Sequence, residues 1–348
     1  GVIVKTCIDA QVVTGGAALQ RYSLNGQTMG TRYSAVFYAR PGLDQPALNR
    51  SLFAAVDEVD RQMSPWQPDS AINRLNAAPV QQWVPVPRGL MQVLDCALRI
   101  SHESGGAFDI GVGDLVNAWG FGPSKHLPDT ATLAALREQP RQTASQALQL
   151  DMPSGLVLKR APITLDLCGI AKGFGVDQLA RCLDDWEIVD YLVGIDGEMR
   201  AQGHKPDGQA WSVALEKPLR GVREVAGVMQ ISHAAIATSG DYRHWVELDG
   251  QTFSHSMNPA THWPLNGALA SVSVIESSCM LADAWATALL VAGPETGPSL
   301  AASRGMDALF VLREGNEFRE ISVIAGQLQS FTLHESLSAQ HPIALNRS

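Results

Sequence analysis

The sequence predicts an α+β protein, because its helical and strand-like segments follow one another without regular alternation. Two amphipathic helical patterns lie before residue 106, short strand-like runs dominate from residue 156 onward, and two further helices interrupt those runs. A doubly wound parallel sheet would need regular alternation of strands and helices, so this order favours α+β. At 348 residues the chain is long enough for one large domain or two subdomains around a substantial core.

Each element is predicted from hydrophobic periodicity and from the residues that bound it. Apolar residues at spacings of three and four predict helices over about 52–63 and from Pro87 to Gly105. Further helices are predicted after Asp129 within 123–150, over 171–185, and over 279–292, where Ser277-Ser278 begins the helix and Gly293-Pro294 ends it. Strands are predicted within 21–40 (with a turn at Asn25-Gly26) and over 156–167, 190–196, 210–216, 227–238, 251–256 and 268–275.

Composition argues against several classes of function. The chain is 45% hydrophobic and 18% charged, and its net charge of −9 without any run of Lys or Arg argues against a nucleic-acid-binding protein. It holds no stretch of about 18 uncharged apolar residues, so we expect no membrane-spanning helix. Residues 1–20 lack a continuous apolar core, so we expect either a cytoplasmic protein or a mature form whose leader has been removed.

The cysteines form no recognisable pattern. They are scattered and odd in number, which fits neither a C-x-x-C metal site nor a disulfide framework. We expect most of them to be small buried hydrophobic side chains. They are Cys7, Cys96, Cys168, Cys182 and Cys279.

The segment Leu165–Asp177 carries more information than any other. An apolar strand is predicted to stop in a tight turn from which a helix begins, and an acid, a small residue and a lysine occupy the junction. Such turns present free backbone N–H groups and the positive end of a helix, which suits a phosphate-bearing ligand. Neither G-x-G-x-x-G nor G-x-x-x-x-G-K-[ST] is present. These residues alone leave a phosphate cradle and an ordinary strand–helix turn equally open.

Asp283 and Thr287 are the best-defined candidate pair. Their spacing of four places both side chains on one face of a helix. A carboxylate and a hydroxyl one turn apart can share Mg²⁺, which prefers oxygen ligands. The alternative, which the residues alone favour, is an acid stabilised by the dipole near a helix start and a threonine bonded to the carbonyl one turn back.

Three further segments are candidates. The glycine-rich run 104–113 either allows a planar ligand close to the backbone or is a loop between helices. Trp66, just beyond a helix end, can stack on an aromatic ring or be an isolated tryptophan at a rim. His255, at the end of a strand, is a candidate general base, and its spacing of seven from His262 argues against a metal pair.

These pieces occur together in an order that resembles the ApbE family, the FAD:protein FMN transferases, from about Gly26 to Phe331. Each motif alone is weak, but their common order is specific. The motifs are Thr28-Met29-Gly30-Thr31, Met63-Ser64-Pro65-Trp66 with Asp69-Ser70, Asn73-Arg74-Leu75-Asn76, Gly106-Ala107-Phe108-Asp109 with Trp119-Gly120-Phe121-Gly122, the segment 166–177, Asp196-Gly197-Glu198, Ala237-Thr238-Ser239-Gly240, the segment 255–264, and Ala282-Asp283-Ala284 with Thr287-Ala288.

The resemblance implies a compact α+β fold of two subdomains over residues 21–332, with FAD in the cleft between them. Residues 1–20 would be an N-terminal extension and residues 333–348 a polar tail. Members use Mg²⁺ to split the FAD pyrophosphate, attach FMN to a Ser/Thr hydroxyl of a partner protein and release AMP. The implied acceptor is a membrane-anchored flavoprotein of a respiratory or nitrous-oxide-reduction system, and the implied location is the periplasm.

The resemblance also assigns roles to residues. The base that deprotonates the acceptor hydroxyl would be His255. Mg²⁺ would be held by Asp283, Thr287 and the backbone carbonyl of Gly169. The FAD would be lined by Met29, Trp66, Ala107, Phe108, Asp109, Asp166, Lys172 and Met257.

The chain departs from the family pattern in three respects. The family commonly has His-x-x-Asp-Pro-x-Thr-Gly, whereas here Asn258 replaces the acid and His262 replaces the glycine. Because an amide does not charge-stabilise a neighbouring base as a carboxylate does, Asn258 predicts slower transfer. Ala286 stands where some relatives carry a second acid, which would leave the metal site with fewer charges. Cys168 stands where Gly, Ser or Thr is more usual.

Two other functions fit the same resemblance. One is an FAD pyrophosphatase, which hydrolyses FAD to FMN and AMP with water as the acceptor. The other is a non-catalytic flavin-binding or flavin-delivery protein, which Asn258 favours modestly.

Overall fold

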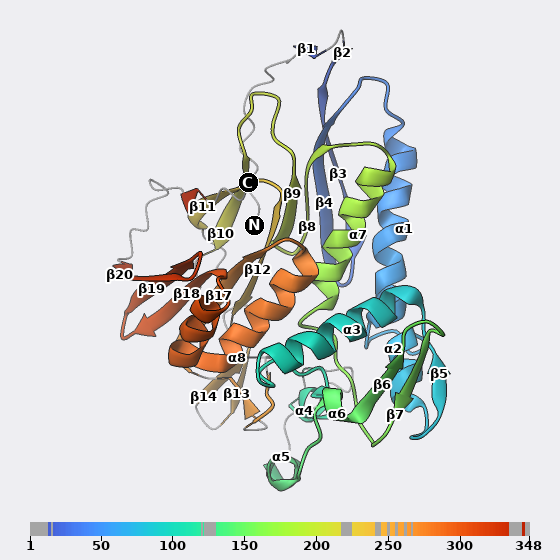
Figure 1. Cartoon of the computed structure of the whole chain (residues 1–348), viewed down its shortest axis with the longest axis vertical. Coiled ribbons are helices and arrows are strands. Elements are labelled where there is room, and N and C mark those ends of the chain that lie inside the picture. Colours follow the sequence, from blue (N-terminus) through green and yellow to red (C-terminus); the bar gives the residue numbers. More distant parts are fainter. Residues whose placement is uncertain are drawn as a thin grey trace.

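A nine-stranded antiparallel sheet forms the centre of the fold (Figure 1). The computed structural model describes residues 13–14, 17–119, 121, 130–216, 225–240, 245–248, 251–254, 257–260, 263–265, 267–333 and 343–344. The strand order is β20-β19-β18-β17-β12-β9-β8-β4-β3. The strands are β3 (Gln20–Thr28), β4 (Thr31–Ala39), β8 (Asp190–Ile195), β9 (Glu198–Gln202), β12 (Ala234–Gly240), β17 (Leu269–Glu276), β18 (Asp307–Glu314), β19 (Glu317–Ile324) and β20 (Gln327–Leu333).

Three long helices cover one face of this sheet: α1 (Gln45–Met63) contacts β3, α7 (Ala171–Asp185) contacts β8 and β9, and α8 (Cys279–Ser303) contacts β12 and β17. The apolar stripe predicted for α1 is confirmed, because Leu52, Val56 and Met63 are buried. Among the described residues, no helix combines the length and the apolar character needed to cross a membrane.

The other face of the sheet carries a second, smaller sheet. Its strands are β10 (Trp211–Glu216), β11 (Val225–Ile231) and β21 (Ile343–Ala344). Alternation along β4 explains how one strand serves both cores: Phe37 packs against α1 and α7, whereas Val36 packs with Trp211 on the opposite side.

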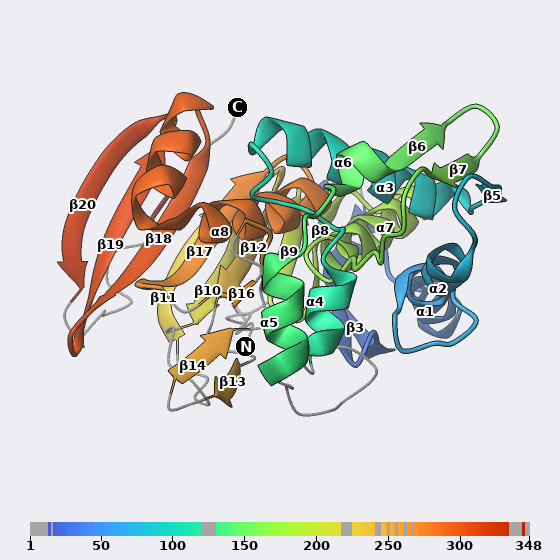
Figure 2. The same ribbon diagram turned by 90° about the horizontal axis from the view of Figure 1, so that it is seen from below.

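Most of the remaining elements lie around α3 (Arg88–Glu103) and in the lower part of the molecule as Figure 1 shows it, which Figure 2 views from below. They are short. They comprise α2 (Ala71–Ala77), β5 (Trp83–Pro85), α4 (Gly113–Ala118), α5 (Thr130–Glu138), α6 (Ala144–Ala147), β6 (Leu148–Asp151) and β7 (Leu156–Lys159), with the hairpins β13 (Trp245–Leu248)–β14 (Gln251–Ser254) and β15 (Met257–Asn258)–β16 (Trp263–Pro264). A separate hairpin, β1 (Val13–Thr14)–β2 (Ala17–Ala18), precedes β3.

The turn predicted at Asn25-Gly26 is wrong, because β3 runs through both residues. The hairpin instead turns at Met29 and Gly30, which both adopt positive φ (50° and 73°), as a two-residue β-turn of this kind requires. Gly26 has a packing role: a β-carbon there would lie 2.6 Å from the ring of Tyr33, its partner on β4. The glycine therefore makes room for an aromatic ring rather than for a turn.

Other strand bounds also differ from those predicted. The strand predicted over 156–167 ends at Lys159, and residues 162–167 are extended without strand pairing. The strand predicted over 227–238 is two strands, β11 and β12, joined by a turn in which His233 adopts a φ of 52°. Strands β9 and β18–β20 were not predicted, because charged residues interrupt their apolar pattern, as in the run Glu317–Ile324.

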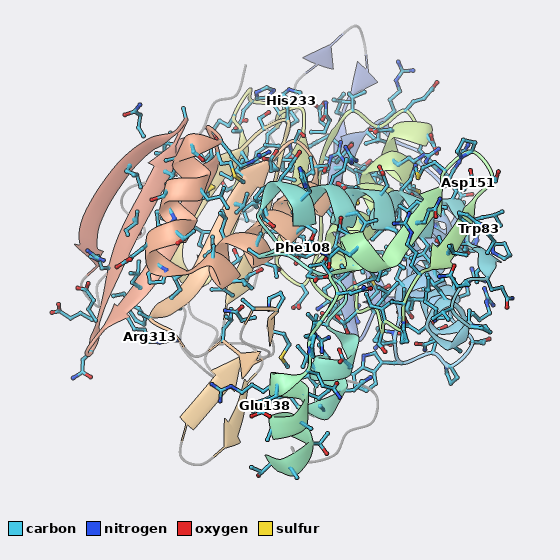
Figure 3. The ribbon with its side chains drawn as sticks, turned by 60° about the horizontal axis from the view of Figure 1, so that its bottom comes forward. Trp83, Phe108, Glu138, Asp151, His233 and Arg313 are labelled. Atoms are coloured by element: carbon cyan, nitrogen blue, oxygen red, sulfur yellow. The ribbon has the colours of Figure 1, made fainter. Side chains whose placement is uncertain are left out.

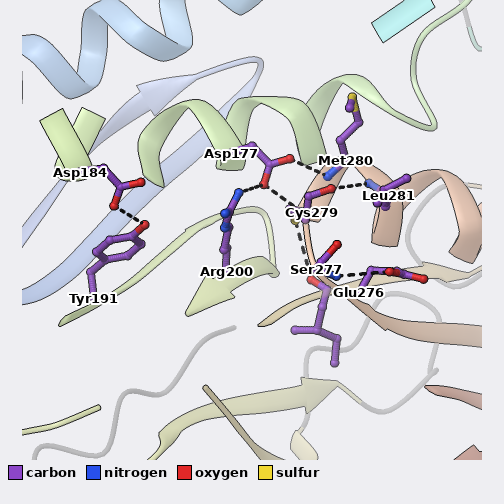
Figure 4. Close-up of polar contacts among 11 residues, drawn as sticks. Asp177, Asp184, Tyr191, Arg200, Glu276, Ser277, Cys279, Met280 and Leu281 are labelled. Carbon is purple, nitrogen blue, oxygen red and sulfur yellow. Dashed lines mark hydrogen bonds and ion pairs between the residues drawn. The ribbon is translucent and has the colours of Figure 1, made fainter. Parts of the chain in front are cut away.

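Helices α7 and α8 cap each other. The carboxylate of Asp177, on α7, accepts hydrogen bonds from the first two N–H groups of α8, those of Cys279 and Met280, both at 2.9 Å (Figure 4). In return Asp283, on α8, accepts a 3.0 Å bond from the N–H of Gly173 in the first turn of α7. Since these N–H groups have no partner within their own helices, the exchange fixes the two helix starts together.

The same crossing requires a glycine. A β-carbon at Gly173 would overlap the carbonyl oxygen of Cys279 and lie 2.7 Å from the β-carbon of Asp283. Farther along, α8 behaves as predicted: Gly293, with a φ of 92°, interrupts it, and Pro294 opens a second helical segment.

Replacing Gly173 with Ala should destabilise the protein by about 1–3 kcal/mol, because a backbone carbonyl cannot move aside as a flexible side chain can. The measurement is urea unfolding followed by tryptophan fluorescence. Gly227→Ala is the matched control, since a β-carbon at Gly227 meets nothing within 4 Å, and its effect should stay within about 0.5 kcal/mol. Equal unfolding midpoints for the two variants would contradict the close crossing.

Candidate functional site

Three predicted site residues meet where the turn before α7 faces α8. A β-carbon at Gly169 would lie 3.2 Å from the hydroxyl oxygen of Thr287 and 3.2 Å from the ring of Phe108. The Thr287 hydroxyl is also 3.1 Å from the hydroxyl of Ser239, on β12. Gly169, Phe108 and Thr287, which come from three distant parts of the sequence, are thus neighbours in the fold.

Asp283 lies one turn before Thr287 on α8 and is buried, with 4% of its surface exposed. A second carboxyl group, that of Glu198 on β9, shares a hydrogen bond with it. Burial raises the pKa of Asp283 to about 7, and burial together with the charge of Asp283 raises the pKa of Glu198 well above its usual range. Among the described residues, one buried oxygen of Glu198 has no hydrogen-bond partner.

This chemistry fits a hard divalent cation. Two carboxyl groups, a hydroxyl and the nearby Gly169 turn supply only oxygen donors, which Mg²⁺ prefers. The second oxygen of Glu198 is thus an acceptor that the described residues leave available. Within the described ranges, no group of three or more His, Cys, Asp or Glu side chains is arranged to hold a metal.

The start of α7 adds positive charge beside this cluster. Lys172, in its first turn, makes a 3.0 Å ion pair with Asp196. Burial lowers the pKa of the Lys172 ammonium group, but the neighbouring acidic groups, Asp196 first among them, raise it by more, so the net shift is upward. An ammonium group has three donors, so one ion pair leaves capacity for a phosphate oxygen. The helix start and Lys172 together suit an anionic ligand.

Asp166 and Cys168 belong to the same turn. One carboxylate oxygen of Asp166 accepts a 2.9 Å bond from the backbone N–H of Cys168, and burial raises the pKa of Asp166. Desolvation and then the charge of Asp166 raise the pKa of the Cys168 thiol to about 12. Cys168 as a residue is nevertheless exposed at this turn.

The glycine-rich loop contributes Ala107, Phe108 and Asp109 from the end of α3. Figure 3 places Phe108 near the middle of the molecule, where it is buried. Asp109 holds the loop together, because one of its oxygens accepts hydrogen bonds from the N–H groups of Gly111 (2.8 Å) and Ala144 (3.1 Å). The carboxylate of Asp109 therefore fixes the loop to the start of α6, and Ala107 and Phe108 precede it in the chain.

Met29 and Trp66, both predicted to line the FAD, lie in separate connections between elements. Met29, in the β3–β4 turn, contacts α7, since a β-carbon at Gly175 would lie 3.5 Å from its sulfur. Its φ of 50° is the conformation that the two-residue β3–β4 turn requires. Trp66, between α1 and α2, is 52% exposed. No described contact joins either side chain directly to Asp283 or Thr287.

The loop that follows β14 is described only in part. His255, the predicted base, and His262 lie outside the described residues. Met257 is buried against Leu115 and Trp119 of the α4 region rather than against the Asp283 cluster. The side-chain oxygen of Asn258 accepts a 2.9 Å bond from the N–H of Ala260, so the amide makes the turn that an aspartate would make here.

Three functional candidates were missed from the sequence alone. Glu198 and Ser239 lie in motifs that the resemblance named, Asp196-Gly197-Glu198 and Ala237-Thr238-Ser239-Gly240, but received no role. Asn76 was likewise part of a motif, and its contact across 89 positions to Leu165 has no local signal. Their presence in the shared motifs was the only available indication.

Comparisons with known proteins find related sequences over most of the chain. The model of the ApbE family matches residues 29–310. The FAD:protein FMN transferase of Klebsiella pneumoniae is 34% identical over 331 residues, which cover 94% of each chain. That of Vibrio cholerae is 36% identical over 303 residues, covering 86% of this chain and 90% of the relative.

Solved structures agree with the fold. The flavinyl transferase of Pseudomonas stutzeri, in its apo form, has a TM-score of 0.77 at 33% identity and covers 87% of this chain and 95% of its own. The flavin transferase of Vibrio cholerae has a TM-score of 0.76 at 35% identity, covering 87% and 97%. The mixed α+β fold predicted from the sequence is confirmed. By its sequence and its fold, the chain belongs to the ApbE family.

Proposed function

We propose that this chain transfers FMN from FAD to a Ser/Thr hydroxyl of a partner flavoprotein, in a reaction that depends on Mg²⁺ and releases AMP. The relatives with which it shares about a third of its residues are named FAD:protein FMN transferases. The observation that supports the proposal most directly is the oxygen-rich cluster of Asp283, Glu198 and Thr287 beside the start of α7.

The chain's own residues would divide the work as follows. Lys172 and the start of α7 bind the pyrophosphate, and Phe108 and Trp66 orient the flavin. Asp283, Thr287 and the carbonyl of Gly169 would hold Mg²⁺, which when bound neutralises charge on the pyrophosphate. The acceptor hydroxyl oxygen bonds to the phosphorus of the FMN half, its proton passes to His255, and the bond to the AMP phosphate breaks.

The acceptor we propose is a membrane-anchored flavoprotein of a respiratory or nitrous-oxide-reduction system, and the compartment is the periplasm. This finer assignment is supported by the family resemblance alone. Fractionation of cells that produce the full-length protein tests the compartment, since recovery in the cytoplasmic fraction would contradict it.

Incubation of the protein with FAD, Mg²⁺ and the flavoprotein domain of a candidate acceptor, followed by intact-mass measurement, tests the reaction. A gain of one FMN on the acceptor, with AMP release, supports transfer. Free FMN and AMP with an unmodified acceptor would instead identify an FAD pyrophosphatase. Retention of unchanged FAD would identify a flavin-binding protein.

Asp283→Asn should abolish Mg²⁺-dependent transfer while preserving the fold. The amide oxygen still accepts the hydrogen bond from Gly173, but the charge that binds the cation is lost. We expect a loss of at least a hundredfold in rate, on the order of the effect of removing a group that stabilises transition-state charge. Mn²⁺ binding, followed by electron paramagnetic resonance, should weaken in parallel.

The matched control is Asp95→Asn, on the exposed side of α3, where the carboxylate pairs only with Arg99 among the described residues. It should leave both rate and Mn²⁺ affinity unchanged. Wild-type Mn²⁺ affinity in Asp283→Asn would remove this residue from the metal site.

His255→Ala should abolish transfer and leave FAD binding intact, because the base acts on the acceptor and not on the flavin. A loss of about 10²–10⁴-fold in rate is expected for a general base. His102→Ala, an exposed histidine of α3, is the control. Flavin fluorescence gives the affinity and intact mass gives the transfer rate. Transfer at the wild-type rate would exclude His255 from the mechanism.

A further inference from the structure

The short helix α2 joins two segments to which the proposed function assigns flavin contacts. It begins after Ser70, whose hydroxyl accepts a 3.3 Å bond from the N–H of Asn73. Asn73 and Asn76 lie three positions apart, so their side chains leave the helix on the same side. Both side-chain amides form hydrogen bonds with backbone groups outside the helix.

Asn73 holds the loop that carries Trp66. Its amide nitrogen donates to the carbonyl oxygens of Pro65 (3.0 Å) and Gln67 (2.8 Å), which flank the tryptophan on either side. The N–H of Trp66 in turn donates to the hydroxyl of Ser64 at 3.1 Å. The backbone around Trp66 is therefore fixed on both sides, while its ring remains half-exposed.

Asn76 holds the segment that carries Asp166. Its side-chain oxygen accepts from the N–H of Leu165 at 2.8 Å, and its nitrogen donates to the Leu165 carbonyl at 3.0 Å. This pair of bonds replaces the strand pairing that residues 162–167 lack. The next residue, Asp166, donates its N–H to the carbonyl of Ile110 at 2.8 Å.

The helix is itself anchored at its end. The ammonium group of Lys159, on β7, donates to the carbonyl oxygen of Asn76 at 2.9 Å. Lys159 is 3% exposed, and burial lowers its pKa. A cation is favourable at the carbonyl end of a helix. Because a seven-residue helix is not stable alone, these outside contacts are what hold it rigid.

We propose that Asn73 and Asn76 are positioning residues that make α2 a fixed link between the Trp66 loop and the Asp166 segment. The inference rests on the proposed function, because it assumes that both segments contact FAD. The Trp66 loop and the Asp166 segment, the two walls of the proposed flavin site, are then already at the separation that FAD needs when FAD binds. Such preorganisation spares the ligand the cost of ordering them.

Measurement of FAD affinity by flavin fluorescence tests the link. Asn73→Ala and Asn76→Ala should each weaken binding about tenfold or more, with the KM for FAD rising and kcat changing little. Loss of either amide already removes the link that fixes the distance between the Trp66 loop and the Asp166 segment. The double variant should therefore bind FAD only a little more weakly than each single variant. Two independent structural effects would instead multiply.

Gln62→Ala is the matched control. Its amide also bridges two elements, accepting a 2.9 Å bond from the N–H of Leu90, but it touches neither wall. It should lower the unfolding midpoint and leave FAD affinity unchanged. Hydrogen exchange without flavin gives a separate reading: Asn76→Ala should speed exchange at Leu165, and Asn73→Ala should not.

The outcomes separate the two proposals. Wild-type FAD affinity in both asparagine variants, or a fully multiplicative double variant, would overturn the positioning role while the proposed function stands. Failure of the wild-type protein to bind FAD would overturn the proposed function. The exchange at Leu165 would then decide whether α2 fixes the Asp166 segment.

Discussion

The exchange of caps between α7 and α8 is the constraint on which the site depends. Asp177 satisfies the first N–H groups of α8, and Asp283 satisfies the N–H of Gly173 in α7. Asp283 is therefore placed by the fold before any ligand arrives. Thr287, one turn farther along the same helix, inherits that placement. A distortion at the crossing would move both proposed metal ligands together.

The same crossing explains the electrostatics of the site. Arg200 neutralises Asp177 at 2.8 Å, so one end of the crossing carries a balanced ion pair. At the other end, Glu198 and Asp283 share a buried region with Lys172, which is already paired with Asp196. Burial raises the pKa of both carboxyl groups, and the charge of Asp283 raises that of Glu198 further. Proteins tolerate such local cost mainly where function requires it.

The sequence predicted what depends on local pattern. The helices α1 and α3 were found because their apolar faces repeat within a few residues, and α8 because Ser and Gly-Pro residues bound it. Gly26 was misassigned because its reason, the ring of Tyr33, lies on another strand. The roles of Glu198 and Asn76 were missed for the same reason, since each acts through a partner that is distant in sequence. The family resemblance assigned Gly169, Phe108 and Thr287 to one site, and in the structure these residues are neighbours.

At the turn of Asn258 the side chain supplies a hydrogen-bond acceptor without a negative charge, whereas an aspartate would supply both. The side-chain oxygen of Asn258 bonds to the N–H of Ala260, and that bond needs an acceptor but no charge. An exchange between Asn and Asp at this position would leave the backbone path unaltered while adding or removing one negative charge three residues after His255. The exchange would therefore alter the charge of this turn without requiring a new hydrogen-bond partner for the backbone.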